Sequence, residues 1–278
     1  MIYVVFTDRL GNNLFQLSAG LSLSNNITIC VPIQEEYIAA LKFKDTFFKD
    51  IKILDFVPNN IPIYEEPFYR YNKIPYCNDS DIILKGFFQS YMYMDRNKVL
   101  NQFSIDKITL NFIEKKYPEI LADKYTSIHV RRGDYLKMLY KHPFCGLKYY
   151  QKAISIIGDN ENFIVVSDDI DWCKRHIKLK NVVFVENTSP IIDFFIQSYC
   201  ENNIISNSSY SWWAAYLNNH KNKIVIAPRL WFGFKNTLNI SDLLLPDYKI
   251  INNYYSPLLF VKAWWQVLVN KIYYMKTL

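Results

Sequence analysis

Cysteine is scarce in this chain and shows no spacing typical of a disulfide framework or a metal site. Among 278 residues there are five cysteines, an odd number, and no C-x-x-C motif. The four histidines are also isolated, since none has a His or Cys partner at the spacing of metal ligands. We therefore expect reduced thiols, a cytoplasmic location and no metal centre built on histidine or cysteine.

Several other signals are missing. Residues 2–6 begin an apolar run with no basic segment or cleavage site around them, so no signal peptide is expected. No internal repeat, low-complexity segment or Gly/Ser linker marks a domain boundary. The 32 basic residues outnumber the 26 acidic ones to give a net charge of only +6. This mild excess fits an anionic small molecule or a membrane surface, and it is too small to indicate nucleic acid.

What the chain has is an alternation of apolar strands and amphipathic helices. Half of its residues are hydrophobic, enough for the cores of two domains. Residues 2–6 are expected to form a buried strand, residues 7–12 a polar turn and residues 13–24 a helix. In the second half, strands are expected at 127–130, 163–166, 182–185, 204–205 and 223–226, and helices at 147–157, 170–176, 191–200 and 209–219. This order predicts an α/β fold in which helices cover both faces of a parallel sheet.

The economical architecture is two Rossmann-like domains facing a cleft. The expected division is an N-terminal domain of residues 1–122, a C-terminal domain of residues 123–250 and a terminal helix within 251–278. Residues 31–95 have weak periodicity, with a strand expected at 82–88 and a helix at 91–100. In such folds ligands bind at the carboxyl ends of the strands, which directs attention to the residues that follow each strand.

The segment from His129 to Asp134 follows one of these strands and contains the adjacent pair Arg131 and Arg132. A guanidinium is permanently charged and can bind phosphate oxygens through two parallel hydrogen bonds. Gly133 lets the backbone turn or approach a ligand closely. Two interpretations are open from these residues, a site for a pyrophosphate group and a set of structural ion pairs.

Two more strands end in polar residues. Ser206 to Ser211 precede a helix whose first N–H groups could bind an anion, although the serines could equally cap that helix. Trp212 and Trp213 on that helix are expected in the core. Asp168 follows another strand and could accept hydrogen bonds from a guanine base. Alternatively, Asp169 and Asp171 form an Asp-x-Asp motif of the kind that holds a divalent ion in metal-dependent sugar transferases.

Four stretches, in order, resemble the α-1,2-fucosyltransferase family, which belongs to the fucosyltransferase superfamily with the His-x-Arg-Arg donor motif. They are Asp8 to Gln16, His129 to Tyr135, Asp193 to Cys200, and Ser206 to Leu217. The likeness runs from residue 7 to about residue 250, whereas residues 31–95 match no known motif. Asp8 and Asn13 depart from the Gly and Gln that are usual in the family's first stretch.

The resemblance implies a fold of the GT-B type and transfer of L-fucose from GDP-fucose to O2 of a terminal galactoside, with inversion and without a metal. A galactose-terminated glycan would be the acceptor, in a surface polysaccharide or lipopolysaccharide (O-antigen) if the source is bacterial. By resemblance, the residues that bind GDP-fucose or act in catalysis are Arg9, Gly11, Asn12, His129, Arg131, Asp168, Ser208, Ser209 and Tyr210. Within this set, His129 and Arg131 would contact the β-phosphate and Asp168 the guanine.

The general base is not assigned by the resemblance. Asp8, Asp134 and the leaving phosphate are the candidates, and a loose transition state would need no strong base. Arg132 and Asp134 are expected to orient Arg131, by pairing with each other or by fixing the backbone. Two other functions compete with fucosyl transfer: a metal-dependent transferase built on Asp169 and Asp171, and a protein that binds a GDP-sugar without turnover. Adhesion through Arg132-Gly133-Asp134 is disfavoured, because these residues follow a buried strand.

The end of the chain is basic and aromatic. No acidic residue occurs from Tyr248 to Leu278, and this segment contains four lysines. The apolar run at 257–275 is too interrupted for a membrane span. It is expected either to pack back across the domains or to lie in the headgroup region of an anionic membrane, which would make the protein peripheral to the inner face of the cytoplasmic membrane.

Overall fold

The protein is described from a computed structural model. The described residues are 1–32, 41–67, 69–77, 80–122, 124–234, 238–254 and 256–276. They form two compact units. Unit 1 comprises Met1–Leu110 and Leu238–Pro246, and unit 2 comprises Asn111–Thr237 and Asp247–Leu278. The division therefore falls at Leu110, within helix α4 (Lys107–Lys116), and a short segment of the second half of the chain returns to unit 1.

In the described part of unit 1, five parallel strands form a sheet in the order β3-β2-β1-β5-β4. The strands are β1 (Ile2–Val5), β2 (Ile27–Cys30), β3 (Lys52–Leu54), β4 (Ile63–Glu65) and β5 (Ile82–Lys85). Helix α1 (Leu10–Leu23) connects β1 to β2 and is followed later by η1 (Tyr91–Tyr93) and α3 (Arg96–Gln102). Gly20 lets α1 lie close to β1, because a Cβ there would sit 2.7 Å from Val4.

The expected start of the first helix was wrong by three residues. Helix α1 begins at Leu10, so Gly11 and Asn12 form its first turn and do not belong to a loop. The Arg9 carbonyl accepts hydrogen bonds from the Asn12 and Asn13 N–H groups, which closes that turn. Arg9 is the N-cap residue, and its side chain makes no cap hydrogen bond. The usual Ser, Thr or Asp signal of a helix start is therefore missing at this position.

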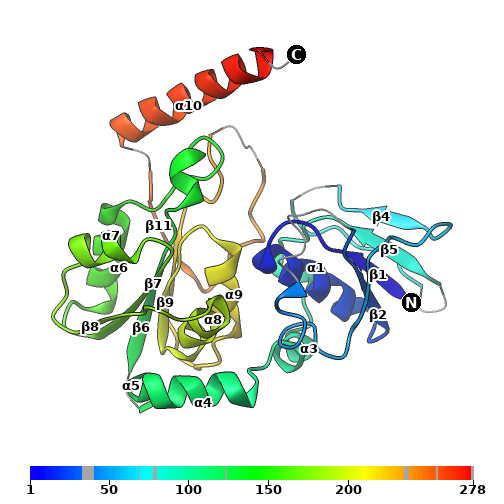
Figure 1. Ribbon diagram of the computed structural model, residues 1–278, viewed down its shortest axis with the longest axis horizontal. Helices are drawn as coiled ribbons and strands as arrows, with labels where there is room; N and C mark the ends of the chain where they lie inside the picture. The colour runs from blue at the N-terminus through cyan, green and yellow to red at the C-terminus, as the bar shows by residue number, and fades with distance from the viewer. Residues whose placement is uncertain are drawn as a thin grey trace. The chain divides into compact units, whose positions relative to one another are not determined.

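Within the described residues of unit 2, six parallel strands are ordered β11-β10-β9-β6-β7-β8 (Figure 1). They are β6 (Tyr125–Val130), β7 (Asn162–Ser167), β8 (Val182–Phe184), β9 (Asn202–Ile204), β10 (Val225–Pro228) and β11 (Lys249–Ile251). The helices are the remainder of α4, α5 (Pro118–Ala122), η2 (Asp134–Lys137), α6 (Leu147–Ile157), α7 (Ile170–His176), α8 (Pro190–Tyr199), α9 (Ser209–Leu217) and α10 (Pro257–Lys276). The expected bounds of α6 and α7 are confirmed to the residue.

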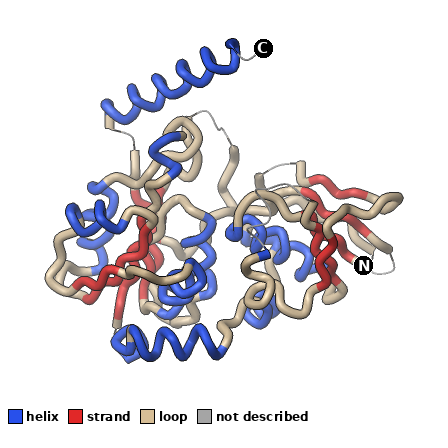
Figure 2. Tube along the Cα trace, in the orientation of Figure 1, coloured by secondary structure: helices blue, strands red, loops and turns tan. Residues whose placement is uncertain are grey.

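Helices cover both faces of the unit 2 sheet (Figure 2). On one face, residues of α6 and α7 such as Tyr150 and Cys173 pack on alternate strand residues such as Ile128 and Val165 in one buried cluster. Helices α8 and α9 lie on the other side of the sheet in Figure 1, and Trp212 and Trp213 of α9 are fully buried, as predicted. The α/β architecture with two parallel sheets is thereby confirmed.

Each sheet contains a reversal of strand order. In unit 1, β1 lies between β2 and β5, and in unit 2, β6 lies between β7 and β9. The connections that leave such a central strand and its non-sequential neighbour run to opposite faces, which opens a crevice at the carboxyl ends of the strands. The reversal points are therefore β1/β5 in unit 1 and β6/β9 in unit 2. The strand pairing alone thus selects two places in the chain for a binding site.

Candidate active site

The β6/β9 reversal point of unit 2 brings together three of the predicted segments. Strands β7, β6 and β9 are neighbours, so the residues that follow them meet at one edge of the sheet. His129 Nδ1 lies 2.8 Å from Ser206 Oγ, which joins the ends of β6 and β9 directly. From α6, the Tyr150 hydroxyl donates to the His129 carbonyl at 3.1 Å and the Tyr149 hydroxyl to the Ile205 carbonyl at 2.5 Å. The core helix therefore fixes the geometry of this edge.

Arg131 is held by two carboxylates at this edge. Its guanidinium lies 2.7 Å from Asp134 Oδ1 and 3.0 Å from Asp168 Oδ2. The three side chains are each about a quarter exposed, at 25 %, 28 % and 24 %, so the cluster is open to a ligand. A guanidinium has five N–H donors, and the two ion pairs leave others for an anionic group. Arg131 is thus a pre-oriented cation at the surface of the site.

Arg132 is held in a different way, against the protein itself. Its Nε lies 3.0 Å from Asp169 Oδ2, and its guanidinium stacks 4.0 Å from the centre of the Trp172 ring. The Arg132 N–H donates to Asp168 Oδ1 at 2.8 Å. The expected pair between Arg132 and Asp134 does not form: Asp134 pairs with Arg131, and Arg132 pairs with Asp169. Arg132 fixes the backbone so that Arg131 faces outward.

Asp169, the first residue of the Asp-x-Asp motif, is engaged on both carboxylate oxygens. Asp169 Oδ1 accepts the Trp172 N–H at the start of α7, and Oδ2 pairs with Arg132. Asp171 lies one residue into the helix and is exposed. Over the described ranges, no group of three or more His, Cys, Asp or Glu side chains is placed to hold a metal ion. The structure thus gives both Asp169 oxygens a role in local folding.

Gly133 is required by the close packing of this cluster. A Cβ at this position would lie 2.6 Å from Asp168 Oδ2, the oxygen that pairs with Arg131. Any side chain would push the carboxylate away from the guanidinium. The Gly in this segment is therefore explained by contact with Asp168 and does not depend on a ligand.

The loop after β9 leads into the N-terminus of α9. Ser208 is the N-cap residue of α9, and within the described residues its hydroxyl makes no cap hydrogen bond. The first N–H groups of a helix have no acceptor inside that helix, and the helix dipole places partial positive charge there. The Tyr210 hydroxyl donates to the Pro190 carbonyl, so this side chain is fixed by packing against α8. Ser208 and Ser209 thus stand at a helix end whose dipole favours a negative charge, close to His129.

His129 is kept neutral at this site. Burial lowers the pKa of His129 to about 3, and the charge of Arg131 acts in the same direction. The ring is only 5 % exposed and lies 5.5 Å from the Tyr210 ring, measured between centroids. At neutral pH the imidazole therefore offers a neutral donor or acceptor, and the positive charge of the site rests on Arg131.

The β1/β5 reversal point of unit 1 is built from amides. Asn12 Nδ2 donates to Asp8 Oδ2 at 2.7 Å, and Gln89 Nε2 donates to Asn12 Oδ1 at 2.8 Å. Gln16 Nε2 donates to the Gly86 carbonyl at 2.9 Å and bridges α1 to the loop after β5. Asp8 and Arg9 are exposed, whereas Gly11 and Asn12 are buried. The predicted first-loop residues therefore lie at one edge, with Asp8 and Arg9 accessible.

Gln89 and Glu66 are two residues of this edge that the sequence analysis missed. Glu66 Oε2 accepts the N–H groups of Phe87 at 2.9 Å and Phe88 at 2.8 Å. Phe88 has a φ of 51°, a costly conformation for a bulky residue, and the carboxylate stabilises it. Burial raises the pKa of Glu66 to about 7, and the nearby Asp242 carboxylate also raises it, whereas the two backbone bonds lower it. Gln89 could have been found from its position just after the expected strand 82–88, whereas Glu66 lies in the region of weak periodicity and has no such signal.

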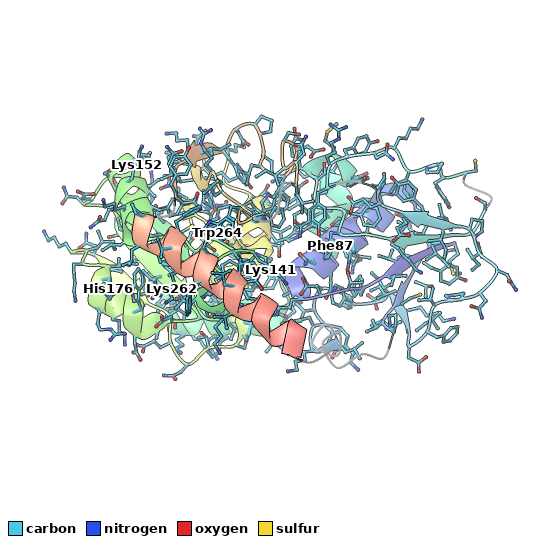
Figure 3. The ribbon with its side chains drawn as sticks, turned by 90° about the horizontal axis from the view of Figure 1, so that it is seen from above. Phe87, Lys141, Lys152, His176, Lys262 and Trp264 are labelled. Atoms are coloured by element: carbon cyan, nitrogen blue, oxygen red, sulfur yellow. The ribbon has the colours of Figure 1, made fainter. Side chains whose placement is uncertain are left out.

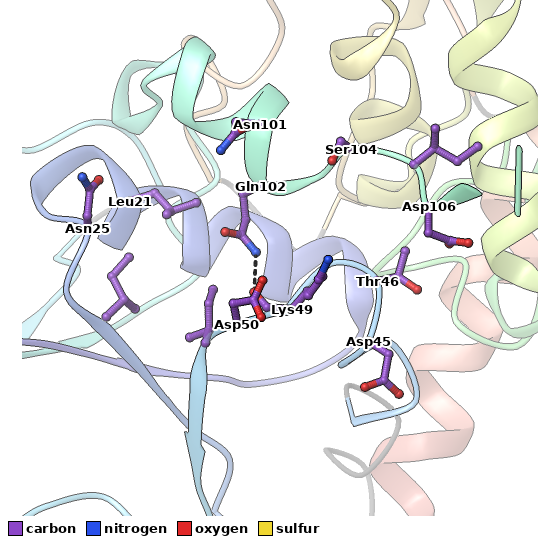
Figure 4. Close-up of a pocket in the computed structure, with 13 residues that line it drawn as sticks. Leu21, Asn25, Asp45, Thr46, Lys49, Asp50, Asn101, Gln102, Ser104 and Asp106 are labelled. Atoms are coloured by element: carbon purple, nitrogen blue, oxygen red, sulfur yellow. Dashed lines mark hydrogen bonds between the residues drawn. The ribbon is translucent and has the colours of Figure 1, made fainter. Parts of the chain in front are cut away.

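A separate hollow lies elsewhere in unit 1, between α1, α3 and the segment before β3 (Figure 4). Its volume is about 310 Å³, and its lining includes Lys49 together with the acidic residues Asp45, Asp50 and Asp106. The Gln102 amide donates to the Lys49 carbonyl at 3.2 Å across its floor. None of the predicted site residues lines it, so the predicted chemistry is confined to the two reversal points.

Comparison with known proteins identifies the family. The model of glycosyl transferase family 11 matches residues 1–237, which is most of the chain and includes both reversal points. The chain belongs to glycosyl transferase family 11. Both edges described above lie within the residues that the family model matches, and the resemblance noted from the sequence motifs is confirmed.

Three curated relatives of this family 11 chain are informative. The O-antigen biosynthesis glycosyltransferase WbnK of Escherichia coli is 37 % identical over 169 residues, covering 55 % of this chain and 56 % of that protein. An α-1,2-colitosyltransferase of E. coli is 33 % identical, with 56 % and 58 % covered. The galactoside 2-α-L-fucosyltransferase SEC1 of Bos taurus is 33 % identical over 104 residues, with 34 % and 28 % covered. The chain thus spans little more than half the length of the two bacterial relatives it matches.

Solved structures place the fold of this family 11 chain among the fucosyltransferases. The α-1,6-fucosyltransferase NodZ from Bradyrhizobium, in a crystal soaked with GDP-fucose, aligns with a TM-score of 0.50 over 78 % of this chain and 91 % of that one. Only 11 % of the aligned residues are identical. The likeness therefore shows a shared GT-B fold.

Proposed function

We propose that this chain transfers L-fucose from GDP-fucose to O2 of a terminal galactoside, with inversion and without a metal ion, during synthesis of a bacterial surface polysaccharide. The observation that carries the proposal is the pre-oriented Arg131 beside the N-terminus of α9, at the β6/β9 reversal point of a family 11 chain. Relatives that act on O-antigen and on galactosides support the acceptor class.

The reaction needs negative charge on the departing GDP to be met by fixed donors. Arg131 supplies a permanent charge, the Ser208 hydroxyl is a further donor, and Ser209 and Tyr210 supply N–H groups at the start of α9. The Ser208 N–H is already used, because it donates to the Ser206 carbonyl at 2.8 Å. His129, neutral at pH 7, contributes a hydrogen bond and not a charge. Donors that are already held by Asp134 and Asp168 need no reorganisation when the sugar–phosphate bond breaks. On this proposal, the diphosphate lies between the ends of β6 and β9.

Asp168 has two tasks in this proposal. Both of its oxygens already hold the arginine pair, through the Arg132 N–H and the Arg131 guanidinium. A carboxylate offers about four acceptor positions, so lone pairs remain for the N–H groups of guanine. Asp168 would therefore link recognition of the base to the orientation of Arg131.

Arg9, Gly11 and Asn12 belong to the acceptor-side unit in this proposal. Of the two side-chain candidates for the general base, Asp134 is held 2.7 Å from Arg131, whereas Asp8 is exposed and accepts a hydrogen bond from the neutral amide of Asn12. This geometry favours Asp8 for taking the proton from the galactose hydroxyl. Asn12 would then be a positioning residue, which orients the Asp8 carboxylate.

The direct test is release of GDP from GDP-fucose with lactose or N-acetyllactosamine as the acceptor, with and without EDTA, followed by linkage analysis of the product. Acceptor-dependent release that survives EDTA and leaves fucose on galactose O2 supports the donor, the linkage position and the independence from metal, and the anomeric configuration of the product tests inversion. Release abolished by EDTA would transfer the assignment to a metal-dependent reaction at Asp169 and Asp171. Binding of GDP without release from any galactoside would indicate a non-catalytic GDP-sugar protein.

A second donor is favoured by one observation, the 33 % identity to an α-1,2-colitosyltransferase. Colitose is L-fucose without the hydroxyl at C3, so the two donors differ by one polar group. A site that hydrogen-bonds O3 rejects the deoxy sugar strongly, whereas an apolar site discriminates by much less. Comparing kcat/KM for GDP-fucose and GDP-colitose therefore identifies the natural donor.

A further inference from the structure

Helix α10 presents a row of large apolar side chains to solvent. We call the residues Leu258, Val261, Trp265, Leu268 and Val269 the outer face of α10; their exposed fractions are 79 %, 64 %, 66 %, 49 % and 46 %. At 100° per residue these positions lie on one side of the helix. Exposed apolar patches of this kind mark interaction surfaces in soluble domains, because water contact with so many large side chains is unfavourable.

The opposite side of α10 is fixed to unit 2. Ala263 is fully buried and Val267 is 8 % exposed. Gln266 accepts the Leu139 N–H at 2.9 Å and donates to the Leu136 carbonyl at 2.8 Å. The Trp264 ring also stacks on Phe234, with centroids 5.2 Å apart. These contacts hold the helix in one orientation about its axis, so the outer face points away from unit 2.

The surroundings of α10 are basic. The chain contains no Asp or Glu from residue 135 to residue 158, the stretch that supplies Leu136 and Leu139, and none from residue 248 to residue 278. Lys141 and Lys262 are exposed; Lys262 is on α10 itself, and Lys141 lies close to the helix in the view from above (Figure 3). An apolar helix face that is flanked by lysines and by no acidic residue of these two segments is complementary to a surface that is negatively charged outside and apolar beneath.

We propose that the outer face of α10 binds the interfacial region of an anionic lipid membrane, with the helix lying in the membrane plane. No helix in the described residues is long and apolar enough to cross a membrane. Trp265 suits the boundary between headgroups and acyl chains, because its ring is amphipathic. Pairing with a second copy through this face is disfavoured, because it would bring two like-charged margins together. The proposal is independent of the transfer reaction, and it places the glycosyltransferase beside lipid-borne acceptors.

Vesicle flotation with the full chain tests the proposal without any activity readout. The protein should float with vesicles of phosphatidylglycerol and phosphatidylcholine and less with pure phosphatidylcholine, and added salt should weaken binding. The double variant Val261→Glu, Trp265→Glu should lower the partition coefficient by at least about tenfold. The matched control is Ile108→Glu, which alters an exposed apolar residue of α4 (84 % exposed) and should float like the wild type.

A charge series makes the test independent of the glutamate variants. Lys141→Ala and Lys262→Ala should each weaken binding to the anionic vesicles roughly fivefold. Lys115→Ala, on α4 at the other end of unit 2 in Figure 1, should leave it unchanged. Circular dichroism of each variant confirms that it is folded.

Three results would overturn the proposal. The wild type could remain unbound to anionic vesicles at low salt. The outer-face and control variants could lose binding equally. Light scattering could show a wild-type dimer that the double glutamate variant converts to a monomer, with no vesicle binding, which would assign the face to self-association.

Discussion

At the carboxyl edge of the unit 2 sheet, ionised groups are paired, whereas at the corresponding edge of the unit 1 sheet most of the contacts are made by amides. Arg131 is held between Asp134 and Asp168 in unit 2, and Asn12 is held between Asp8 and Gln89 in unit 1. Both edges lie where the strand order of the sheet reverses, and they differ in charge. A permanent cation suits a diphosphate, and an amide network suits the hydroxyl groups of a sugar. Under the proposed function, the charged edge would therefore meet the diphosphate, and the amide edge would meet sugar hydroxyl groups.

The largest expected effect comes from removing the cation of unit 2. Arg131→Ala should lower the rate of GDP release by about 10²–10⁴-fold, the scale of losing a key electrostatic contact to the transition state. Arg131→Lys keeps the charge but loses the planar group that donates two parallel hydrogen bonds, so its rate should lie between the rates of Arg131→Ala and the wild type. Steady-state GDP release measures both, and circular dichroism checks their folding. An Arg131→Ala enzyme with wild-type activity would remove this residue from the site.

A smaller effect concerns the buried acid of unit 1. The pKa of Glu66 is raised from 4.5 to about 7, so between these values the unfolded chain loses this proton before the folded chain does. Stability should therefore fall as pH rises through this range, by at most about 3 kcal/mol. Glu66→Gln stays neutral, so its unfolding free energy relative to the wild type should increase from pH 4.5 to pH 7. Urea unfolding across this range measures the difference.

The control for this experiment is the neighbouring residue. Glu65 is exposed at the end of β4, and Glu65→Gln controls for the loss of one carboxylate at the protein surface. In unit 2, the contribution of His129 to stability should depend on pH with the opposite sign. Its pKa is lowered from 6.5 to about 3, so its contribution to stability is present above pH 6.5 and is lost as pH falls through this range. If the unfolding free energies of Glu66→Gln and the wild type changed equally with pH, Glu66 would not be a buried, protonated acid.

The smallest expected effect is the coupling within the amide network. A double-mutant cycle of Asn12→Ala and Gln89→Ala should give an interaction energy of about 0.5–1.5 kcal/mol, the net value of one buried neutral hydrogen bond. Urea unfolding measures it. A cycle that pairs Asn12→Ala with Gln102→Ala should be additive, since Gln102 bonds the Phe47 and Lys49 carbonyls instead. Equal coupling in both cycles would show that the substitutions disturb unit 1 as a whole.

The helices with local signals could be predicted from sequence. Helix α7 was expected at its observed bounds, because Asp169 caps its start and its apolar residues repeat with helical period. Helix α1 begins earlier than expected, because its first-turn residues Asn12 and Asn13 are polar but buried in contacts that span the fold. Strands β3 and β4 were missed, since each has three residues with partly exposed side chains. Such short strands are specified by their neighbours in the sheet.

The position of the candidate residues at the carboxyl ends of the strands was predictable, but the contacts among them were not. Residues after β6, β7 and β9 were expected together, because parallel strands share one carboxyl edge. The pairing of Asp168 with Arg131 depends on the register of β6 against β7, in which Val130 lies opposite Ser167. Glu66 lay in a region without periodicity, and its importance arises from the Phe88 backbone conformation that it stabilises. Neither relation has a local signal in the chain.

The segment Leu238–Pro246 has a consequence for the order in which the protein is made. Asp242 in this segment accepts the Tyr71 N–H on its side chain at 2.6 Å and the Tyr91 N–H on its carbonyl at 3.0 Å. These contacts of unit 1 cannot form until residue 246 has left the ribosome, after residues 111–237 of unit 2 have been synthesised. The first unit to be translated is therefore completed late, and a fragment of residues 1–110 lacks a buried part of its own structure.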